Sequence, residues 1–219
     1  MTEPEAKALL AAHGIAVPRG VLLAPAEDPA PRLAGLRPPF ALKAVSPRLL
    51  HKSDAGGVAL RLADAAAVAA ARDAMAARPA IIAAQPTGYL AEEMAPPGHE
   101  LVIGGTRDAK FGPVIMLGLG GIFVEVFQDV AFRLCPITPR EARDMLAELR
   151  SLPVLRGARG GVVAHEAAIV ATLLAVGGQD GLLLRRPDIA ELDINPLIVG
   201  AEGAVAADAR VILGTEAPA

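Results

Sequence analysis

Residues 92–125 read EEMAPPGHELVIGGTRDAKFGPVIMLGLGGIFVE and carry the clearest structural pattern in the chain. Apolar runs alternate there with turn-forming Gly, Pro and Asp. With the residues on either side, this spacing predicts strands at 89–94, 100–106, 113–117 and 122–127, separated by turns at 96–98, 107–108 and 118–121. Because the turns are short, we expect consecutive strands to pair as an antiparallel meander.

Helical and strand patterns flank this meander on both sides. The segments before it are predicted to form a helix ending at 13, strands at 40–45 and 58–62, and a helix at 63–78. Those after it are predicted to form helices at 139–151 and 165–176 and strands at 189–194 and 204–207. The fold class is therefore α+β in two lobes, which we place at residues 1–88 and 89–219.

The composition narrows the functional class. With 53% hydrophobic residues among 219, and 21 Lys and Arg against 24 Asp and Glu, the chain has material for a core but no basic excess for nucleic acid or an anionic membrane. The longest uncharged stretch, 111–124, contains a proline and four glycines, so no membrane span is expected. A single cysteine, Cys135, and an N-terminus unlike a signal peptide favour the reducing cytoplasm.

The first candidate site is the loop HKSDAGGV, residues 51–58, which joins two predicted strands. Gly56 and Gly57 permit positive φ and close backbone approach, as a phosphate cradle requires. Lys43 lies in an otherwise apolar strand, so its ammonium needs an anionic or aqueous environment. The alternatives are a glycine hairpin with solvated polar residues and an edge-strand lysine that reaches solvent.

The second candidate site is ELDINPL, residues 191–197, followed by AADAR at 206–210. Asp193 and Asn195 share one face of a strand, and Asp208 lies on the adjoining strand. Three such oxygens suit a hard cation such as Mg²⁺. The alternative is a strand that ends in an Asn-Pro turn. Glu93, Met94 and Glu100 are candidates for a nucleotide hinge, although acids on surface strands are common.

Taken together, five motifs occur in the order and spacing of a known family. They are ALKAVSP, HKSDAGGV, residues 92–125, LRGARGG and ELDINPLIV. The chain resembles, over almost its whole length, the ATP-grasp beta subunit of NDP-forming acyl-CoA synthetases, the acetate–CoA ligase (ADP-forming) type, related to the succinyl-CoA synthetase beta chain. The resemblance implies an ATP-grasp fold whose two lobes grip a nucleotide. The segment at 24–39 is shorter than the family's pattern.

The resemblance also implies roles in ATP or ADP binding. Lys43 would bind the nucleotide phosphates, and the Gly56-Gly57 loop would cover them. Glu93 and the backbone from Met94 would face the adenine, and Glu100 would bind the ribose.

The remaining implied roles concern phosphoryl transfer. Asp193, Asn195 and Asp208 would hold Mg²⁺, and Arg159 would face the transferring phosphate. His51 would be a second phosphorylation site, which receives a phosphoryl group from a phosphohistidine on a CoA-binding alpha subunit and passes it to ADP. A neutral imidazole is a suitable nucleophile near pH 7.

These implications predict one half of a hetero-oligomeric acyl-CoA synthetase. Two other readings remain: a single-chain ATP-grasp carboxylate ligase, and a nucleotide-binding regulatory subunit without turnover. No separate Rossmann fingerprint for CoA occurs in the sequence, which favours the half-enzyme.

Overall fold

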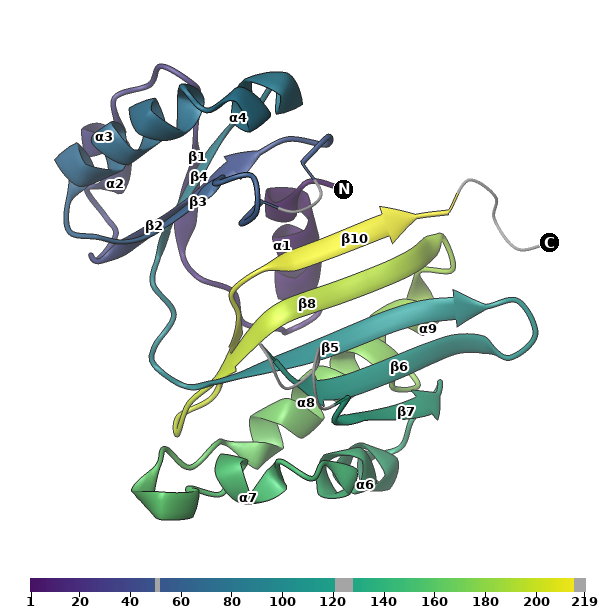
Figure 1. Cartoon of the computed structure of the whole chain (residues 1–219). Coiled ribbons are helices and arrows are strands. Elements are labelled where there is room, and N and C mark those ends of the chain that lie inside the picture. Colours follow the sequence, from purple (N-terminus) through teal and green to yellow (C-terminus); the bar gives the residue numbers. More distant parts are fainter. Residues whose placement is uncertain (50–51, 121–127, 215–219) are drawn as a thin grey trace. The chain divides into compact units, whose positions relative to one another are not determined.

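The computed structural model describes residues 1–49, 52–120 and 128–214, with the side chain of Arg159 also outside the description. The chain forms two compact units, and Figure 1 labels their elements. The first unit comprises Pro18–Ala95, and the second comprises Glu3–Val17 together with the chain from Pro96 onward. Each unit has its own sheet and its own apolar core.

The first unit is built on a four-stranded antiparallel sheet in the order β1-β4-β2-β3. Its strands are β1 (Gly20–Leu23), β2 (Phe40–Val45), β3 (Val58–Leu62) and β4 (Gly88–Glu93). Its helices are α2 (Pro29–Leu33), α3 (Ala65–Ala76) and α4 (Pro79–Ala84). Leu23, Phe40, Leu42, Val68, Ile81 and Tyr89 are among the buried residues of its core.

Local sequence explains where these helices begin. The Asp64 side chain accepts a hydrogen bond from Ala67 N–H and so caps α3, as its position before an alanine run predicts. Pro79 then starts α4 as a separate helix, so the single helix predicted at 63–78 is followed by a second one. Gln85 ends α4 in the left-handed conformation.

The second unit contains only part of the predicted meander, because the strand predicted at 89–94 is β4 and pairs within the first sheet, not with β5. Its sheet has the order β10-β8-β5-β6-β7, with β9 also paired to β8. The strands are β5 (His99–Asp108), β6 (Gly112–Leu119), β7 (Val130–Leu134), β8 (Ile189–Val199), β9 (Ala204–Ala206) and β10 (Ala209–Leu213), all antiparallel to their partners. The meander is confirmed for β5 and β6, and β7 was not predicted. The strand predicted at 122–127 lies outside the described residues.

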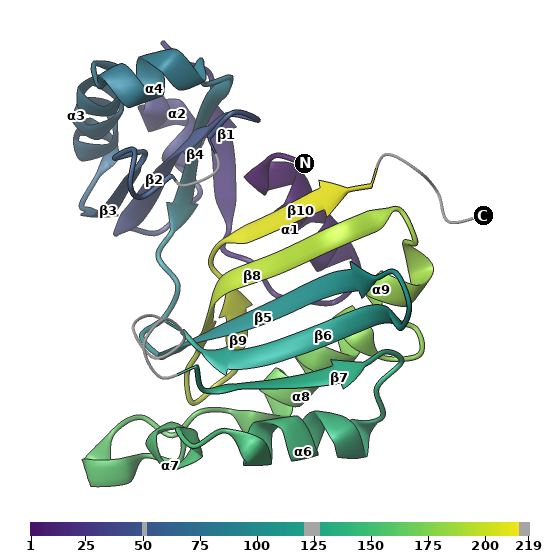
Figure 2. The same cartoon turned by 45° about the vertical axis from the view of Figure 1, so that its right-hand side comes forward.

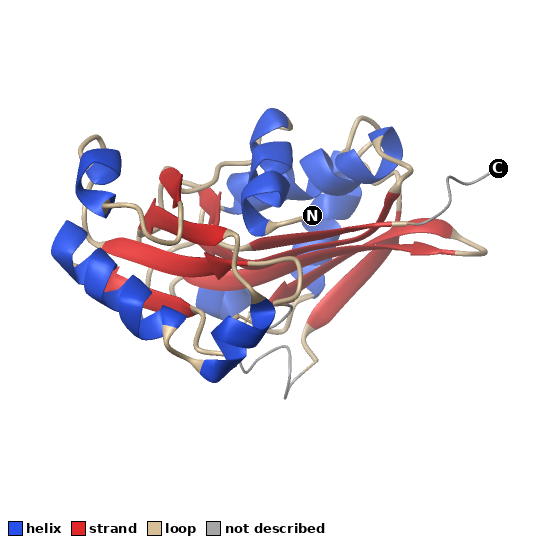
Figure 3. Ribbon diagram, turned by 90° about the horizontal axis from the view of Figure 1, so that it is seen from above, coloured by secondary structure: helices blue, strands red, loops and turns tan. Residues whose placement is uncertain are grey.

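Helices cover one face of this second sheet (Figure 2). They are α1 (Glu3–Ala12), α6 (Pro139–Glu148), α7 (Leu152–Leu155), α8 (Glu166–Gly177) and α9 (Leu182–Arg185), with a 3₁₀ turn, η1, at Ala158–Gly160. Thr138 and Glu141 form a reciprocal capping box that starts α6. Met145, Ile169 and Leu192 are among the residues buried between helices and sheet. Figure 3 distinguishes the helices from the strands of each sheet by colour.

The compact units divide the chain differently from the predicted lobes, 1–88 and 89–219. Strand β4 pairs with both β1 and β2, so it is an internal strand of the first sheet and belongs with that unit. Helix α1, which the prediction placed in the first lobe, contributes Ala6 and Leu10 to the core of the second unit. Both differences arise from long-range packing, which local sequence patterns do not encode. No helix in the described ranges is both long and apolar enough to span a bilayer.

Candidate nucleotide and metal site

Lys43 occupies an internal position of the first sheet. Its strand, β2, lies between β4 and β3, so the alternative of an edge-strand lysine is wrong. Lys43 Nζ lies 3.1 Å from Glu92 Oε2, and the two side chains are only 8% and 3% exposed. Lys43 pairs in register with Leu90, so Glu92 lies two residues further along β4 on the same face. Glu92 was not predicted as a site residue, because its position beside Lys43 depends on the pairing of β2 with β4.

The glycine loop uses its own amides internally. Gly56 N–H donates to the Ser53 carbonyl at 2.9 Å, and Gly57 N–H donates to the Lys52 carbonyl at 2.7 Å. These two amides therefore do not form the predicted phosphate cradle in this structure. Gly56 has φ of +68°, which explains the glycine locally. His51 lies outside the described residues.

Glu93 and Met94, the residues predicted to face adenine, form hydrogen bonds with other residues of the first unit. Glu93 Oε1 accepts hydrogen bonds from Arg19 Nη1 at 3.2 Å and from Arg37 N–H at 3.0 Å. Met94 N–H donates to the Pro39 carbonyl at 3.1 Å. Because neighbouring residues of a strand point to opposite faces, Glu93 faces away from the side that carries Glu92 and Lys43. The Met94 N–H is therefore already donated within the first unit, and the predicted role of this backbone toward adenine stays a prediction.

Glu100 belongs to the second unit, at the start of β5, and is exposed. Its backbone carbonyl accepts a hydrogen bond from Gly120 N–H at 2.6 Å. Glu93 and Met94 belong to the first unit. The residues predicted to contact adenine therefore belong to the first unit, and the residue predicted to contact the ribose belongs to the second.

The structure brings the three predicted metal ligands together. Leu192 and Ile194 of β8 are buried in the core, so the intervening Asp193 and the following Asn195 project from the other face. Asn195 N–H donates to the Asp208 carbonyl at 3.2 Å, which joins β8 to the residue just before β10. Asp193 pairs in register with Arg210, two residues beyond Asp208. The Mg²⁺ role of this set remains a prediction.

The electrostatics of the set fit a cation. Burial raises the pKa of Asp193; the Arg210 guanidinium lowers it in part, and the carboxylates of Glu191 and Asp208 raise it again. Arg210 also forms an ion pair with Glu191. Within the described ranges no three His, Cys, Asp or Glu residues group as a metal site, so the set depends on the Asn195 amide oxygen as well. Carboxylate and amide oxygens are the donors that Mg²⁺ prefers.

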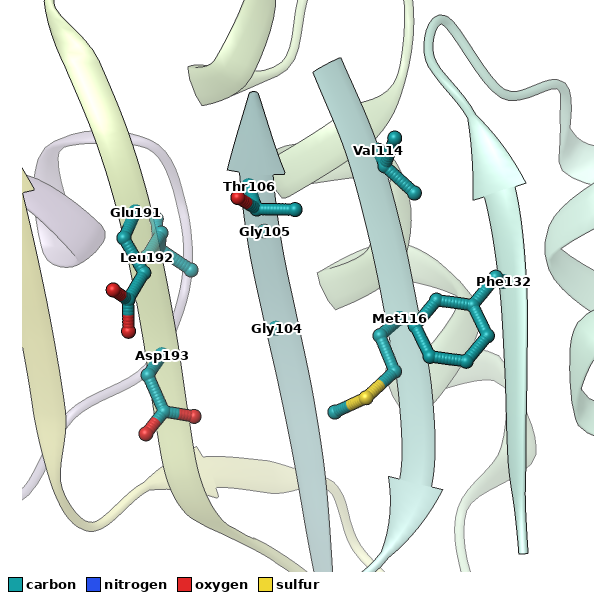
Figure 4. A pocket seen from close by; sticks show the side chains of 9 residues that line it. All are labelled: Gly104, Gly105, Thr106, Val114, Met116, Phe132, Glu191, Leu192 and Asp193. Atoms are coloured by element: carbon teal, nitrogen blue, oxygen red, sulfur yellow. The ribbon is translucent and has the colours of Figure 1, made fainter. Parts of the chain in front are cut away.

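An open hollow of about 330 Å³ adjoins the metal set on the same face (Figure 4). Figure 4 shows the carboxylates of Glu191 and Asp193 on one side and the side chains of Met116 and Phe132 on the other. A Cβ atom at Gly104 would lie 3.3 Å from Met116 Cε, so the missing side chain leaves the floor of the hollow open. The hollow therefore combines an apolar wall with two carboxylates.

Arg159 lies in η1, between Gly157 and Gly160, which both have positive φ. The segment that leads to it is anchored by Asp129, a buried residue that the sequence analysis missed. Asp129 Oδ1 accepts Arg150 N–H and Oδ2 accepts Ser151 N–H, each at 2.8 Å. A lone acid between a turn and a strand carries no local signal of this role, because its partners lie 21 and 22 residues away.

Comparison with known proteins identifies the family. Residues 1–213 match the ATP-grasp domain family. The chain belongs to the ATP-grasp family. This ATP-grasp chain is 42% identical over 216 residues to the acetate–CoA ligase [ADP-forming] I subunit beta of Pyrococcus furiosus, which covers 97% of this chain and 91% of the relative.

Solved structures of similar ATP-grasp proteins agree with the fold. The dinucleotide-forming acetyl-coenzyme A synthetase 1 of Ca. Korarchaeum cryptofilum, in complex with coenzyme A, Ca-AMPCP and HgCl+, matches with a TM-score of 0.90 and 38% identity, covering 98% of this chain and 93% of that one. A second structure of that enzyme contains coenzyme A and Mg-AMPPCP, with its phosphohistidine segment pointing towards the nucleotide binding site. It has a TM-score of 0.80 and 36% identity, covering 97% and 92% of the two chains. The expected ATP-grasp fold is confirmed.

Proposed function

We propose that this chain is the ATP-grasp subunit of an ADP-forming acyl-CoA synthetase. It would relay a phosphoryl group between ATP or ADP and phosphohistidine, so that a partner subunit forms acyl-CoA from a carboxylate and CoA. The observation that carries this proposal is the similarity to a separate beta subunit, which extends over 97% of this chain and 91% of the relative.

In the first unit, Lys43 would supply a positive charge for the nucleotide phosphates, and Glu93 and the backbone near Met94, at the end of the neighbouring strand β4, would face the adenine. In the second unit, Glu100 offers a carboxylate to the ribose. The Gly56-Gly57 loop would shape the phosphate end through its backbone conformation, since its two N–H groups are donated within the loop.

Asp193, Asn195 and Asp208 would hold Mg²⁺ together with the nucleotide. When bound, Mg²⁺ neutralises charge that develops on the phosphoryl oxygens. The three residues would contribute by holding oxygen donors in place before the nucleotide arrives, because a backbone hydrogen bond already joins Asn195 to Asp208. Arg159 would add a further positive charge near the transferring group.

His51 would carry the phosphoryl group. The phosphorus–nitrogen bond on the partner's histidine breaks as a new one forms to the His51 imidazole. In the second step, a terminal phosphate oxygen of ADP attacks the phosphorus, and the imidazole leaves. Each step exchanges one bond to phosphorus for another and needs no additional reactant. The partner is therefore a CoA-binding alpha subunit with its own phosphohistidine, in a hetero-oligomer.

Labelling with γ-³²P ATP and Mg²⁺, with and without the CoA-binding partner, tests the relay. The wild-type chain should acquire an acid-labile, base-stable label on His51, and His51→Ala should lose both the label and partner-driven ATP formation. His13→Ala is the matched control, because His13 lies at the end of α1 and contacts the Leu9 carbonyl. Full ATP formation by His51→Ala would overturn the relay.

An acyl-CoA assay distinguishes this proposal from the two alternatives, a single-chain ligase and a regulatory subunit without turnover. The isolated chain with ATP, CoA and acetate or larger acids should form no thioester until the partner is added. Thioester formation by the chain alone would instead identify a single-chain ligase. Nucleotide binding with neither labelling nor turnover in the complex would identify a regulatory subunit.

A further inference from the structure

The buried ion pair between Lys43 and Glu92 has no place in the roles described so far. Both residues lie on internal strands of the first sheet, and their charged atoms are 3.1 Å apart. The two side chains are 8% and 3% exposed, so neither charge is solvated as a surface charge would be. A buried pair of this kind is costly to form, and a hydrophobic pair would serve stability as well. Stability alone therefore does not explain why the sheet contains it.

The geometry of the pair controls the Lys43 ammonium directly. A buried lysine without an anionic partner tends to lose its proton, and its four-carbon chain has several rotamers. The Glu92 carboxylate favours the charged form and holds Nζ at one position over β4. Glu92 can do this because β2 and β4 pair in register, with Lys43 opposite Leu90 and Glu92 two residues beyond.

Comparison with Glu93, the next residue, shows that the ion pair with Lys43 is specific to Glu92. Glu93 follows it in sequence but points to the opposite face of the sheet. There its carboxylate contacts Arg19 and the backbone of Arg37. Of these adjacent acids, only Glu92 is placed to act on Lys43.

We propose that Glu92 is a positioning residue, which holds the Lys43 ammonium charged and oriented toward the nucleotide phosphates. This inference rests on the proposed function, because it assumes that Lys43 binds those phosphates. Glu92 itself would not touch the nucleotide phosphates, since two anions would repel each other. It would act entirely through Lys43.

A double-mutant cycle in the assembled complex tests this inference. The variants are Glu92→Gln, Lys43→Met and the double variant, assayed for acyl-CoA formation with ATP, CoA and carboxylate varied separately. Glu92→Gln should lower kcat/KM for ATP by roughly ten- to hundred-fold, as expected when a charged group is misplaced by about 1 Å. The KM for the carboxylate should not change. The double variant should lose no more than Lys43→Met alone, because Glu92 acts only through the lysine.

Two further variants keep the outcomes distinct. Glu92→Asp, which retains the charge, should recover part of the lost kcat/KM, and its measurement decides the matter if Glu92→Gln does not fold. Asp73→Asn is the matched control, since Asp73 is an acid of the first unit that is 68% exposed and pairs only with the adjacent Arg72 among the ion pairs described. It should retain wild-type kinetics.

Two results would overturn the positioning role: wild-type kcat/KM for ATP in Glu92→Gln, or losses in the two single variants that multiply in the double variant. An inactive wild-type complex would count against the proposed function itself. The two failures are therefore distinguishable.

Discussion

Asn195 of β8 donates a backbone N–H hydrogen bond, at 3.2 Å, to the carbonyl of Asp208, the residue just before β10. This bond fixes the backbone positions of two of the three candidate Mg²⁺ ligands relative to each other. The third, Asp193, projects from the same face of β8 as Asn195 because side chains alternate along a strand. Strand β8 thus positions Asp193 and Asn195, and Asp208 joins them from the short connection between β9 and β10.

The first prediction concerns this donor set. Asn195→Ala and Asp208→Ala should each lower turnover of the complex by about 10²-fold, because a lost metal ligand removes several kcal/mol of charge stabilisation. Nucleotide affinity without Mg²⁺ should change little, as isothermal titration calorimetry in EDTA would measure. Glu202→Ala is the control, since Glu202 is an exposed acid in the neighbouring turn. Normal turnover in both ligand variants would refute the assignment.

The second prediction uses the raised pKa of Asp193. Burial raises this pKa, so Asp193 binds its proton more tightly in the folded protein than in the unfolded chain. The stability that Asp193 contributes is therefore fully present below its unfolded pKa and is lost as the pH rises through the folded pKa. At pH 7 without metal, Asp193→Asn should raise the melting temperature. Mg²⁺ with nucleotide should then stabilise the wild type more than the variant.

Thermal unfolding in EDTA and in Mg²⁺ with ATP measures both effects of Asp193→Asn. A lower melting temperature for Asp193→Asn in EDTA would contradict the electrostatic argument. An equal gain from Mg²⁺ and ATP in both proteins would remove Asp193 from the donor set.

The third prediction concerns Asp129, which anchors the segment that leads to Arg159. Burial raises its pKa, but the Ser151 side chain and the backbone N–H groups of Arg150 and Ser151 lower it by more, so the net pKa is below the usual value. Its stabilisation is therefore present above the unfolded pKa and is lost as the pH falls through the folded one. Asp129→Asn should cost about 1–3 kcal/mol at pH 7.

Urea unfolding of the Asp129→Asn variant at pH 7 and at pH 4 measures this anchor. The variant should also lose part of the acid sensitivity of the wild type. The control is Asp144→Asn, which removes a half-exposed acid from α6 and should change stability by less than about 0.5 kcal/mol. Equal stability of Asp129→Asn and the wild type would show that the anchor is dispensable.

The fourth prediction concerns Gly56, whose φ is +68°. An added Cβ atom would lie 1.7 Å from Arg78 Nη1, but that guanidinium is the end of a flexible side chain and can move. The backbone of residue 56 cannot adjust in the same way, because its positive φ is strained for alanine. Gly56→Ala should therefore lower the free energy of unfolding by about 1–3 kcal/mol. Gly35→Ala should be close to neutral, since no atom lies within 4 Å of its added Cβ. Chemical denaturation of both variants compares them, and equal stability would refute the strain argument.

Local sequence patterns predicted the features that depend on a few neighbouring residues. The start of α6 at Pro139 and the antiparallel pairing of β5 with β6 both follow from residues close together in the chain. The shared face of Asp193 and Asn195 followed from strand periodicity alone. The family resemblance, which rests on motif order and spacing, pointed to the ATP-grasp fold.

Other features depend on residues distant in sequence, and only the tertiary structure decided them. Strand β4 joins the first unit because β1 and β2 pair on either side of it, and α1 joins the second because its apolar face enters that core. Glu92 became visible as the partner of Lys43, and Asp129 as the acceptor for Ser151, only when strands and turns were brought together. A single sequence encodes alternation and turns, but the choice of partner for a buried charge is made by packing, where desolvation makes each unpaired charge costly.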